Sequence, residues 1–189
     1  MHDVPLILAS TSPRRKQLLT EAGYEFTVVP PADSAESTVD HPETPTELVA
    51  RLACQKAQDV ALRTDRGLII GCDTVAECEG QILGKPAGIE HARQMLELLR
   101  GREHHVYSGL CLWRRPGDQH RVEVEVTTLR MDQISDDQLE SYLATDQWQG
   151  KAGAFGYQDS LDWVHILSGS ASNVVGLPLE LLRKMLEGR

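Results

Sequence analysis

The first residues that could do chemistry follow a short apolar run near the amino terminus. Residues 6–9 are typical of a buried strand, and the next six, Ser10 to Arg15, combine hydroxyl groups with two arginines. A helix that begins here presents unpaired backbone N–H groups and a partial positive charge at its first turn. Hydroxyl and guanidinium groups added to that turn make a site for phosphate oxygens. The pattern predicts an anion site, and its alternative is a plain helix cap at Ser12 with both arginines in solvent.

A lysine interrupts the apolar face of the second expected helix. Thr44 and Glu47 have the spacing of a capping box, and the apolar residues that follow keep helical spacing to about Arg63. Lys56 falls within that apolar face. A lysine in such a place either extends to solvent along its aliphatic stem or meets an anion.

Three carboxylates are candidates to act with these cations. Asp73 follows residues 68–72, an expected buried strand, and α/β proteins bind ligands at the carboxyl ends of strands. Asp33 and Glu36 lie in a loop rich in Pro and Ser. Either of them could join Asp73 in holding a hard divalent cation that bridges phosphates. The alternatives are a turn capped by Asp73 and loop acids that are simply solvated.

The remaining segments must position these side chains. Residues 75–83 predict a hairpin that turns at Glu79-Gly80, which brings Lys85 back toward Asp73. Apolar periodicity and turn residues indicate the other elements. These are helices at 90–100 and 135–144, strands at 106–113, 121–131 and 163–167, a glycine-rich loop at 150–156, and a strand end at 174–177 before a final helix opened by Pro178.

Composition limits the class of protein. A chain of 189 residues can bury a core without disulfides, so we expect one domain over residues 1–189 and cysteines that act as small apolar residues in a reducing compartment. With 28 acidic and 19 basic residues, the net charge of −9 argues against a broad surface for duplex nucleic acid. No leader or membrane-spanning pattern occurs, which predicts a cytoplasmic protein without membrane contact. The sequence also lacks the HExxH motif of zinc proteases, the GxSxG motif of serine hydrolases and the GxxxxGK[ST] motif of P-loop proteins.

Six short motifs occur in one order along nearly the whole chain, and together they resemble the Maf family. The motifs are LASTSPRR (8–15), ACQKA (53–57), GCDT (71–74), GKP (84–86), AGAFGYQ (152–158) and VVGLP (174–178). The resemblance implies a nucleoside triphosphate pyrophosphatase that uses a divalent cation, Mg²⁺ or Mn²⁺, to release a monophosphate and pyrophosphate. It also implies an α/β fold similar to inosine triphosphate pyrophosphatases, in which a mixed twisted sheet and flanking helices form two lobes around a deep cleft. Family members are often homodimers.

The same resemblance assigns roles to the candidate residues. Asp73 matches the catalytic carboxylate, described in the family as the proton acceptor. The phosphate-contacting side chains and the binding turn are matched by Arg15, Lys56, Lys85, Ser10 and Ser12. The family's second acidic residue matches Glu36 if this chain carries one extra residue before it, and Asp33 otherwise.

Three further positions bear on the substrate. Arg14, Thr74 and Gln158 match the branch that resembles dTTP/UTP pyrophosphatases, so a pyrimidine substrate is favoured over 7-methyl-GTP. A regulator of cell division that binds nucleotides without hydrolysis is the alternative from another class. Asp73 argues against it, because a carboxylate repels a triphosphate unless a metal ion intervenes.

Overall fold

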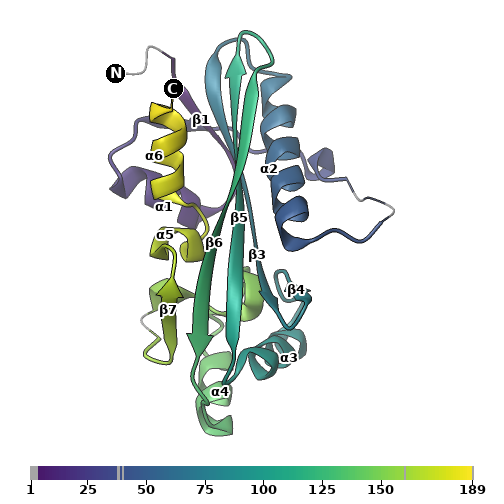
Figure 1. Ribbon diagram of the computed structural model, residues 1–189, viewed down its shortest axis with the longest axis vertical. Helices are drawn as coiled ribbons and strands as arrows, with labels where there is room; N and C mark the ends of the chain where they lie inside the picture. The colour runs from purple at the N-terminus through teal and green to yellow at the C-terminus, as the bar shows by residue number, and fades with distance from the viewer. Residues whose placement is uncertain (1–3, 38, 40, 160, 189) are drawn as a thin grey trace.

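The computed structural model describes residues 4–37, 39, 41–159 and 161–188, and a seven-stranded sheet forms its centre (Figure 1). The strands are β1 (Leu6–Ala9), β2 (Phe26–Val28), β3 (Gly67–Cys78), β4 (Gln81–Leu83), β5 (Glu103–Arg115), β6 (His120–Met131) and β7 (Val164–Ser168). Their order is β2-β1-β3-β5-β6-β7, and β4 pairs with β3. Because β1 is parallel to β2 and β3 while the other pairs are antiparallel, the sheet is mixed, as predicted.

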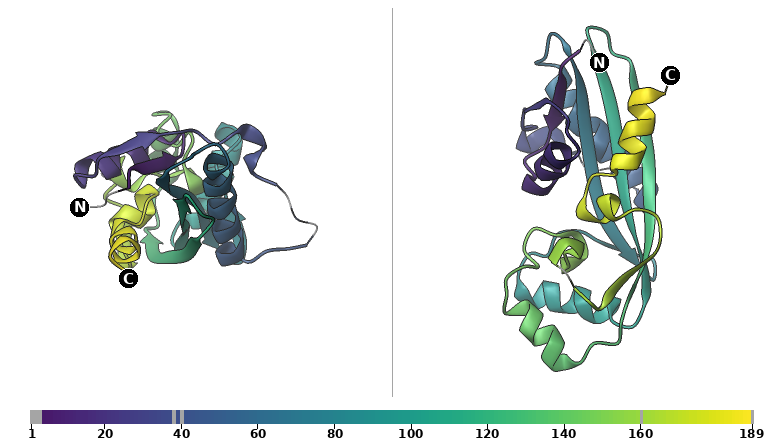
Figure 2. Two further views of the ribbon diagram at one scale, coloured as in Figure 1. Left: turned by 90° about the horizontal axis from the view of Figure 1, so that it is seen from above. Right: turned by 90° about the vertical axis from the view of Figure 1, so that its left-hand side faces the viewer.

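Helices pack on both faces of this sheet and at one of its ends (Figure 2). The helices are α1 (Pro13–Glu21), α2 (Pro45–Ala61), α3 (Ile89–Leu99), α4 (Asp136–Leu143), α5 (Ala171–Val175) and α6 (Leu179–Glu187), with short 3₁₀ turns η1 (Asp33–Ala35), η2 (Ala152–Ala154) and η3 (Tyr157–Asp159). One apolar cluster lies under α1 and α6, a second lies under α2, and a third joins α3 and α4 to the far end of the long strands. No helix in the described part of the chain is both long and apolar enough to cross a membrane.

Two glycines let α2 lie directly on the sheet. A Cβ atom built on Gly71 would be 2.2 Å from the Ala53 carbonyl oxygen, and one on Gly109 would be 2.1 Å from the Val49 carbonyl oxygen. Side chains at these positions would therefore push the helix backbone away. The close approach brings the next part of α2, which carries Lys56, over strand β3.

Most of the expected elements are present, and the local signals that predicted them are visible. Ser12 and Thr44 cap α1 and α2, and the capping box of α2 is complete. The turn between β3 and β4 has positive φ at both central residues, 51° at Glu79 and 79° at Gly80, as a tight hairpin requires. The cysteines are free thiols, and three of them are buried while Cys54 is only partly so.

Two expectations about strand ends were wrong. Strand β3 does not end at Asp73 but continues to Cys78, because β5 pairs with it along its whole length. Strand β1 ends beside Gly71, so Asp73 still lies just beyond the parallel part of the sheet. The segment at 174–177 is not a strand end, because Val174 and Val175 belong to helix α5 and Gly176 and Leu177 follow that helix. The β-branched valines favoured a strand, but the buried Asn173 binds the Val106 carbonyl oxygen and fixes a helical turn.

Candidate active site

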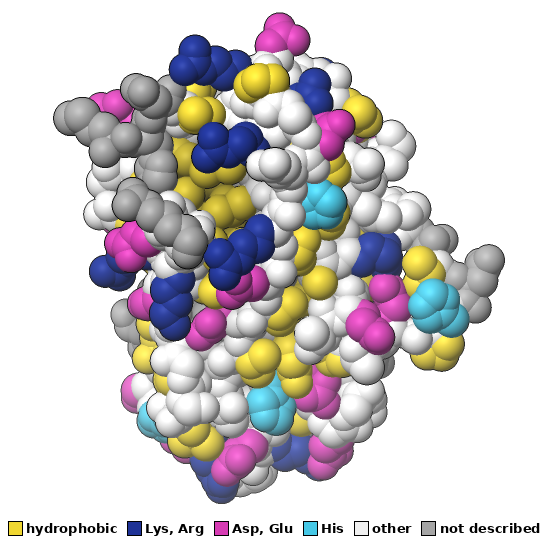
Figure 3. Space-filling model, turned by 45° about the horizontal axis from the view of Figure 1, so that its top comes forward, with side chains coloured by type: hydrophobic (Ala, Val, Ile, Leu, Met, Phe, Trp, Pro, Cys, Tyr) yellow, Lys and Arg dark blue, Asp and Glu magenta, His cyan; other side chains and the backbone are white. Residues whose placement is uncertain are grey.

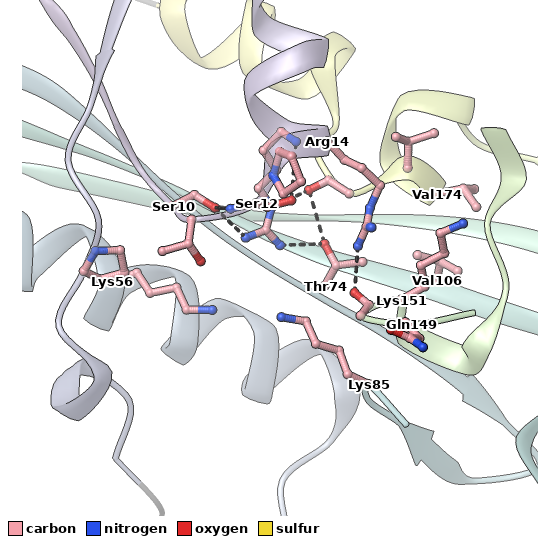
Figure 4. Close-up of a pocket in the computed structure, with 18 of the residues that line it drawn as sticks. Ser10, Ser12, Arg14, Lys56, Thr74, Lys85, Val106, Gln149, Lys151 and Val174 are labelled. Atoms are coloured by element: carbon pink, nitrogen blue, oxygen red, sulfur yellow. Dashed lines mark hydrogen bonds between the residues drawn. The ribbon is translucent and has the colours of Figure 1, made fainter. Parts of the chain in front are cut away.

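A cavity of about 600 Å³ opens where α1, α2, the β3–β4 hairpin, the glycine-rich loop and α5 meet (Figure 4). Its volume is in the range of sites for small molecules. Five cationic side chains and two carboxylates line it: Arg14, Arg15, Lys56, Lys85, Lys151, Asp33 and Glu36. In a chain with net charge −9, positive charge is therefore concentrated in one hollow, as local binding of an anion requires.

Arg15 ties the first turn of α1 to two other elements of the cavity. Its Nε donates to the Gly176 carbonyl oxygen at 2.8 Å, and its Nη2 donates to Thr74 Oγ1 at 3.3 Å. A longer contact of 3.4 Å joins its Nη1 to Ser10 Oγ, which also accepts from the Ser12 backbone N–H at 3.1 Å. The guanidinium group is held at the cavity wall with its charge directed inward.

Lys56 lies between two of the three carboxylates that the sequence proposed. Its Nζ is 2.5 Å from Asp73 Oδ1 and 3.0 Å from Glu36 Oε1. The Lys56 and Asp73 side chains are 11% and 13% exposed, whereas Glu36 is 49% exposed. Asp33 also borders the cavity, but Glu36 is the loop carboxylate that contacts Lys56. Asp73 itself is not among the described residues that line the cavity and is reached there through Lys56.

Lys85 adds a second ammonium group near Lys56. Figure 4 shows the two side chains approaching from opposite sides, with their charged ends directed toward one another. The pKa of Lys85 is lowered by burial, and further by the positive charges of Arg15 and Lys56. Among the described residues no carboxylate lies within ion-pair distance of Lys85, so an anion that enters the cavity would relieve this repulsion.

The three residues matched to substrate preference all border the cavity, but two of them already have protein partners. Arg14 Nη2 donates to the Gly150 carbonyl oxygen at 2.7 Å, which links α1 to the glycine-rich loop. Burial and the neighbouring Arg15 lower the pKa of Arg14. Thr74 Oγ1 shares a hydrogen bond of 2.8 Å with Ser108 Oγ. Gln158 faces the cavity from η3.

Sequence reasoning missed a buried ion pair in the glycine-rich loop. Lys151 Nζ contacts Asp159 Oδ2, and the two side chains are only 10% and 12% exposed. The Tyr142 hydroxyl donates to the same carboxylate oxygen at 3.5 Å, and burial, followed by the Asp159 charge, raises the pKa of Tyr142. The pair joins the two ends of the segment that carries Phe155 and Gln158. An irregular loop has no periodicity, so no sequence signal indicated this contact.

The donor set fits a divalent cation that also binds phosphate oxygens. Asp73 and Glu36 converge on one ammonium group, which shows that both carboxylates can face a single positive charge. Mg²⁺ in nucleotide sites is bound by one or two carboxylates and by oxygens of the substrate. These two side chains meet that requirement.

Comparison with known proteins identifies the family and the fold. Residues 5–189 match the family described as Maf-like protein, and the chain belongs to that family. A protein of Rhodopirellula baltica named dTTP/UTP pyrophosphatase is 54% identical over 96% of this chain and 81% of its own. A protein of the same name from Ruminiclostridium cellulolyticum is 37% identical over 96% of this chain and 94% of its own length. The solved structure of a HAM1 protein from Coxiella burnetii aligns with a TM-score of 0.55 at 16% identity, over 98% of this chain and 100% of that one, and confirms the predicted fold.

Proposed function

We propose that this chain hydrolyses dTTP and UTP to the nucleoside monophosphate and pyrophosphate. The observation that carries the proposal is that Lys56, which lines the cavity together with Glu36, Arg15 and Lys85, is paired with both Asp73 and Glu36. Relatives that share more than a third of their residues with the chain are named dTTP/UTP pyrophosphatase, which supports this substrate class.

The phosphates are assigned to the cationic side of the cavity. Arg15, Lys56 and Lys85 neutralise the charge that develops on the phosphate oxygens, while Ser10 and Ser12 place hydroxyl groups at the first turn of α1. Positioning and charge neutralisation contribute most of the catalysis in reactions at phosphorus. The site therefore needs no protein nucleophile.

Asp73 is assigned the role of proton acceptor for the water that attacks the α-phosphorus. An ordinary aspartate has a pKa of about 4 and is a weak base at neutral pH. Asp73 and Glu36 are the residues that would hold Mg²⁺ or Mn²⁺, and such a cation, when bound, lowers the pKa of a bound water. Lys56 must leave Asp73 for this role, and the phosphates offer its ammonium group another partner.

The base is assigned to the opposite end of the cavity. Figure 4 shows Val106, Val174 and Gln149 on the side of the cavity away from Lys56. Phe155 and Gln158 also line the cavity, and the amides of Gln149 and Gln158 can pair with the edge of a pyrimidine. This favours dTTP and UTP over 7-methyl-GTP, which is the second candidate. The cytoplasmic location and the homodimer stay predictions.

A substrate panel tests the proposal. We expect pyrophosphate release from dTTP and UTP with Mg²⁺ or Mn²⁺, and slower release from CTP and 7-methyl-GTP. The variant Asp73→Asn should lose turnover while its melting temperature stays near that of the wild type. Binding of a non-hydrolysable dTTP analogue, without cleavage of any triphosphate, would instead support the nucleotide-binding regulator.

A further inference from the structure

The loop that carries Glu36 is attached to one face of helix α2. Three side chains on that helix and one in the turn just after it, spaced four residues apart, reach the loop: Arg51, Gln55, Asp59 and Arg63. Residues at this spacing lie above one another on a helix surface. We call these four residues the α2 stripe. The two halves of the stripe hold different parts of the loop.

The carboxyl-terminal half of the stripe holds the start of the loop. The Ala32 backbone N–H donates to Asp59 Oδ2 at 3.0 Å, and Arg63 Nη2 donates to the Pro30 carbonyl oxygen at 2.5 Å. Arg63 and Asp59 also form an ion pair of 2.8 Å along the helix. This half fixes where the chain enters the loop after β2.

The amino-terminal half of the stripe holds the residue next to Glu36. The Ser37 backbone N–H donates to Gln55 Oε1 at 3.2 Å, and Gln55 Nε2 donates to Ser37 Oγ at 2.6 Å. Arg51 Nη1 donates to the Ser37 carbonyl oxygen at 2.5 Å. The other edge of the Arg51 guanidinium group donates to both carboxylate oxygens of Glu43, at 2.7 and 2.5 Å.

Glu36 needs such support because burial does not hold it. Its side chain is 49% exposed and lies in a loop, whereas Asp73 is 13% exposed within a strand. An exposed loop carboxylate explores many positions unless its backbone is fixed. Three hydrogen bonds with two helix side chains restrain the backbone N–H, the carbonyl oxygen and the hydroxyl of Ser37. They therefore also restrain the adjacent Glu36.

We propose that Arg51 and Gln55 are positioning residues that hold Glu36 opposite Asp73 for cation binding. The proposal rests on the role of Glu36 in the proposed function. Neither side chain lines the cavity, so both act through the loop and not on the substrate. Residues that support a metal ligand in this way typically contribute 10–100-fold to metal affinity or activity.

Two variants test the proposal without a change of charge. Gln55→Leu removes both contacts to Ser37 side-chain and backbone groups, and Arg51→Lys keeps the positive charge but loses the fork that joins Ser37 to Glu43. Each should lower kcat for dTTP by about 10-fold or more, with KM within about 2-fold of the wild type. Arg100→Lys is the matched control, because Arg100 is also 21% exposed and pairs with Asp136 at the other end of the molecule. It should keep the kcat of the wild type.

Two further measurements are independent of turnover. Titration of the free protein with Mn²⁺, followed by electron paramagnetic resonance, should show weaker binding in Gln55→Leu than in the Arg100→Lys control. Hydrogen exchange should show faster exchange of the Ser37 amide in Gln55→Leu, since that amide has lost its acceptor. Thermal melting confirms that each variant is folded. If Gln55→Leu does not fold, Ser37→Ala, which removes only an exposed hydroxyl acceptor, replaces it.

A double-mutant cycle with Glu36→Gln decides whether the stripe acts through Glu36. If it does, adding Gln55→Leu to Glu36→Gln should lower kcat no further. The proposal would be overturned if Gln55→Leu lowered kcat by the same factor in the wild type and in Glu36→Gln. It would also be overturned if the Gln55→Leu variant had the kcat and Mn²⁺ affinity of the wild type. A different result would mark failure of the proposed function: no cleavage of any triphosphate by the wild type, or full activity in Glu36→Gln. The exchange and Mn²⁺ measurements would still report on the stripe in that case.

Discussion

The buried pair Lys151–Asp159 offers a quantitative test of how the glycine-rich loop is held. In Lys151→Met, the Asp159 carboxylate keeps the Tyr142 hydroxyl, at 3.5 Å, and the attraction of the Arg14 charge. Removing one partner of a buried ion pair costs about 3–5 kcal/mol. Because these side chains are still 10% and 12% exposed, we expect a loss near the lower end, about 3 kcal/mol in the free energy of unfolding.

Replacing both partners should cost much less than replacing one. In Lys151→Met combined with Asp159→Leu no uncompensated charge stays buried, and such apolar replacements are often close to neutral. The assay is urea denaturation of the wild type, both single variants and the double variant. Lys184→Met, at an exposed position in α6, is the control and should stay within about 0.5 kcal/mol of the wild type.

The pair should also affect substrate choice, because it closes the segment that carries Gln158. The loop backbone runs directly over it: a Cβ atom on Gly156 would be 2.3 Å from both Lys151 Nζ and Asp159 Oδ2. We expect the Lys151→Met variant to lose discrimination between dTTP and 7-methyl-GTP. Additive losses of stability in the double variant, or a Lys151→Met variant as stable as the wild type, would refute the reasoning.

Three other predictions follow from single contacts. His104 is fully buried, burial lowers its pKa to about 4, and the unfolded chain therefore binds its proton first on acidification. The free energy of unfolding should fall by about 3 kcal/mol between pH 6.5 and 4, and urea titrations of His104→Leu should lack this part of the slope. Gly109→Ala should push α2 off the sheet at Val49 and lower kcat about 100-fold, measured by pyrophosphate release, together with a lower melting temperature. Arg15→Lys keeps the charge but loses the fork that reaches Gly176, so KM for dTTP should rise about 10-fold in the same assay.

The parts of the fold that sequence could predict are those set by neighbouring residues. The Ser12 and Thr44 caps and the Glu79-Gly80 turn depend on side chains within a few positions, so their signals are local. The end of β3 was mispredicted because it depends on β5, a strand about 35 residues away.

The contacts of the candidate site also divide into those that a local sequence pattern indicates and those that it does not. Lys56 could be singled out because its charge interrupts an apolar helical face, and the structure does pair it with two carboxylates. The contact from Arg14 to Gly150 joins residues 136 positions apart and leaves no pattern in either segment. The α2 stripe has a clear spacing, but its function depends on a loop partner that periodicity does not reveal.

Charge is consistent with the triphosphate substrate of the proposed function, although the net charge of the chain is −9. Among the described residues that line the cavity are five cations, whose mutual repulsion is only partly offset by the carboxylates. Burial lowers the pKa of Lys85, and the positive charges of Arg15 and Lys56 lower it further. In the proposed function an incoming polyphosphate relieves this repulsion, which contributes to its binding free energy. A monophosphate carries less charge and relieves less of it. The same arrangement that attracts the triphosphate therefore also favours release of the nucleoside monophosphate after cleavage.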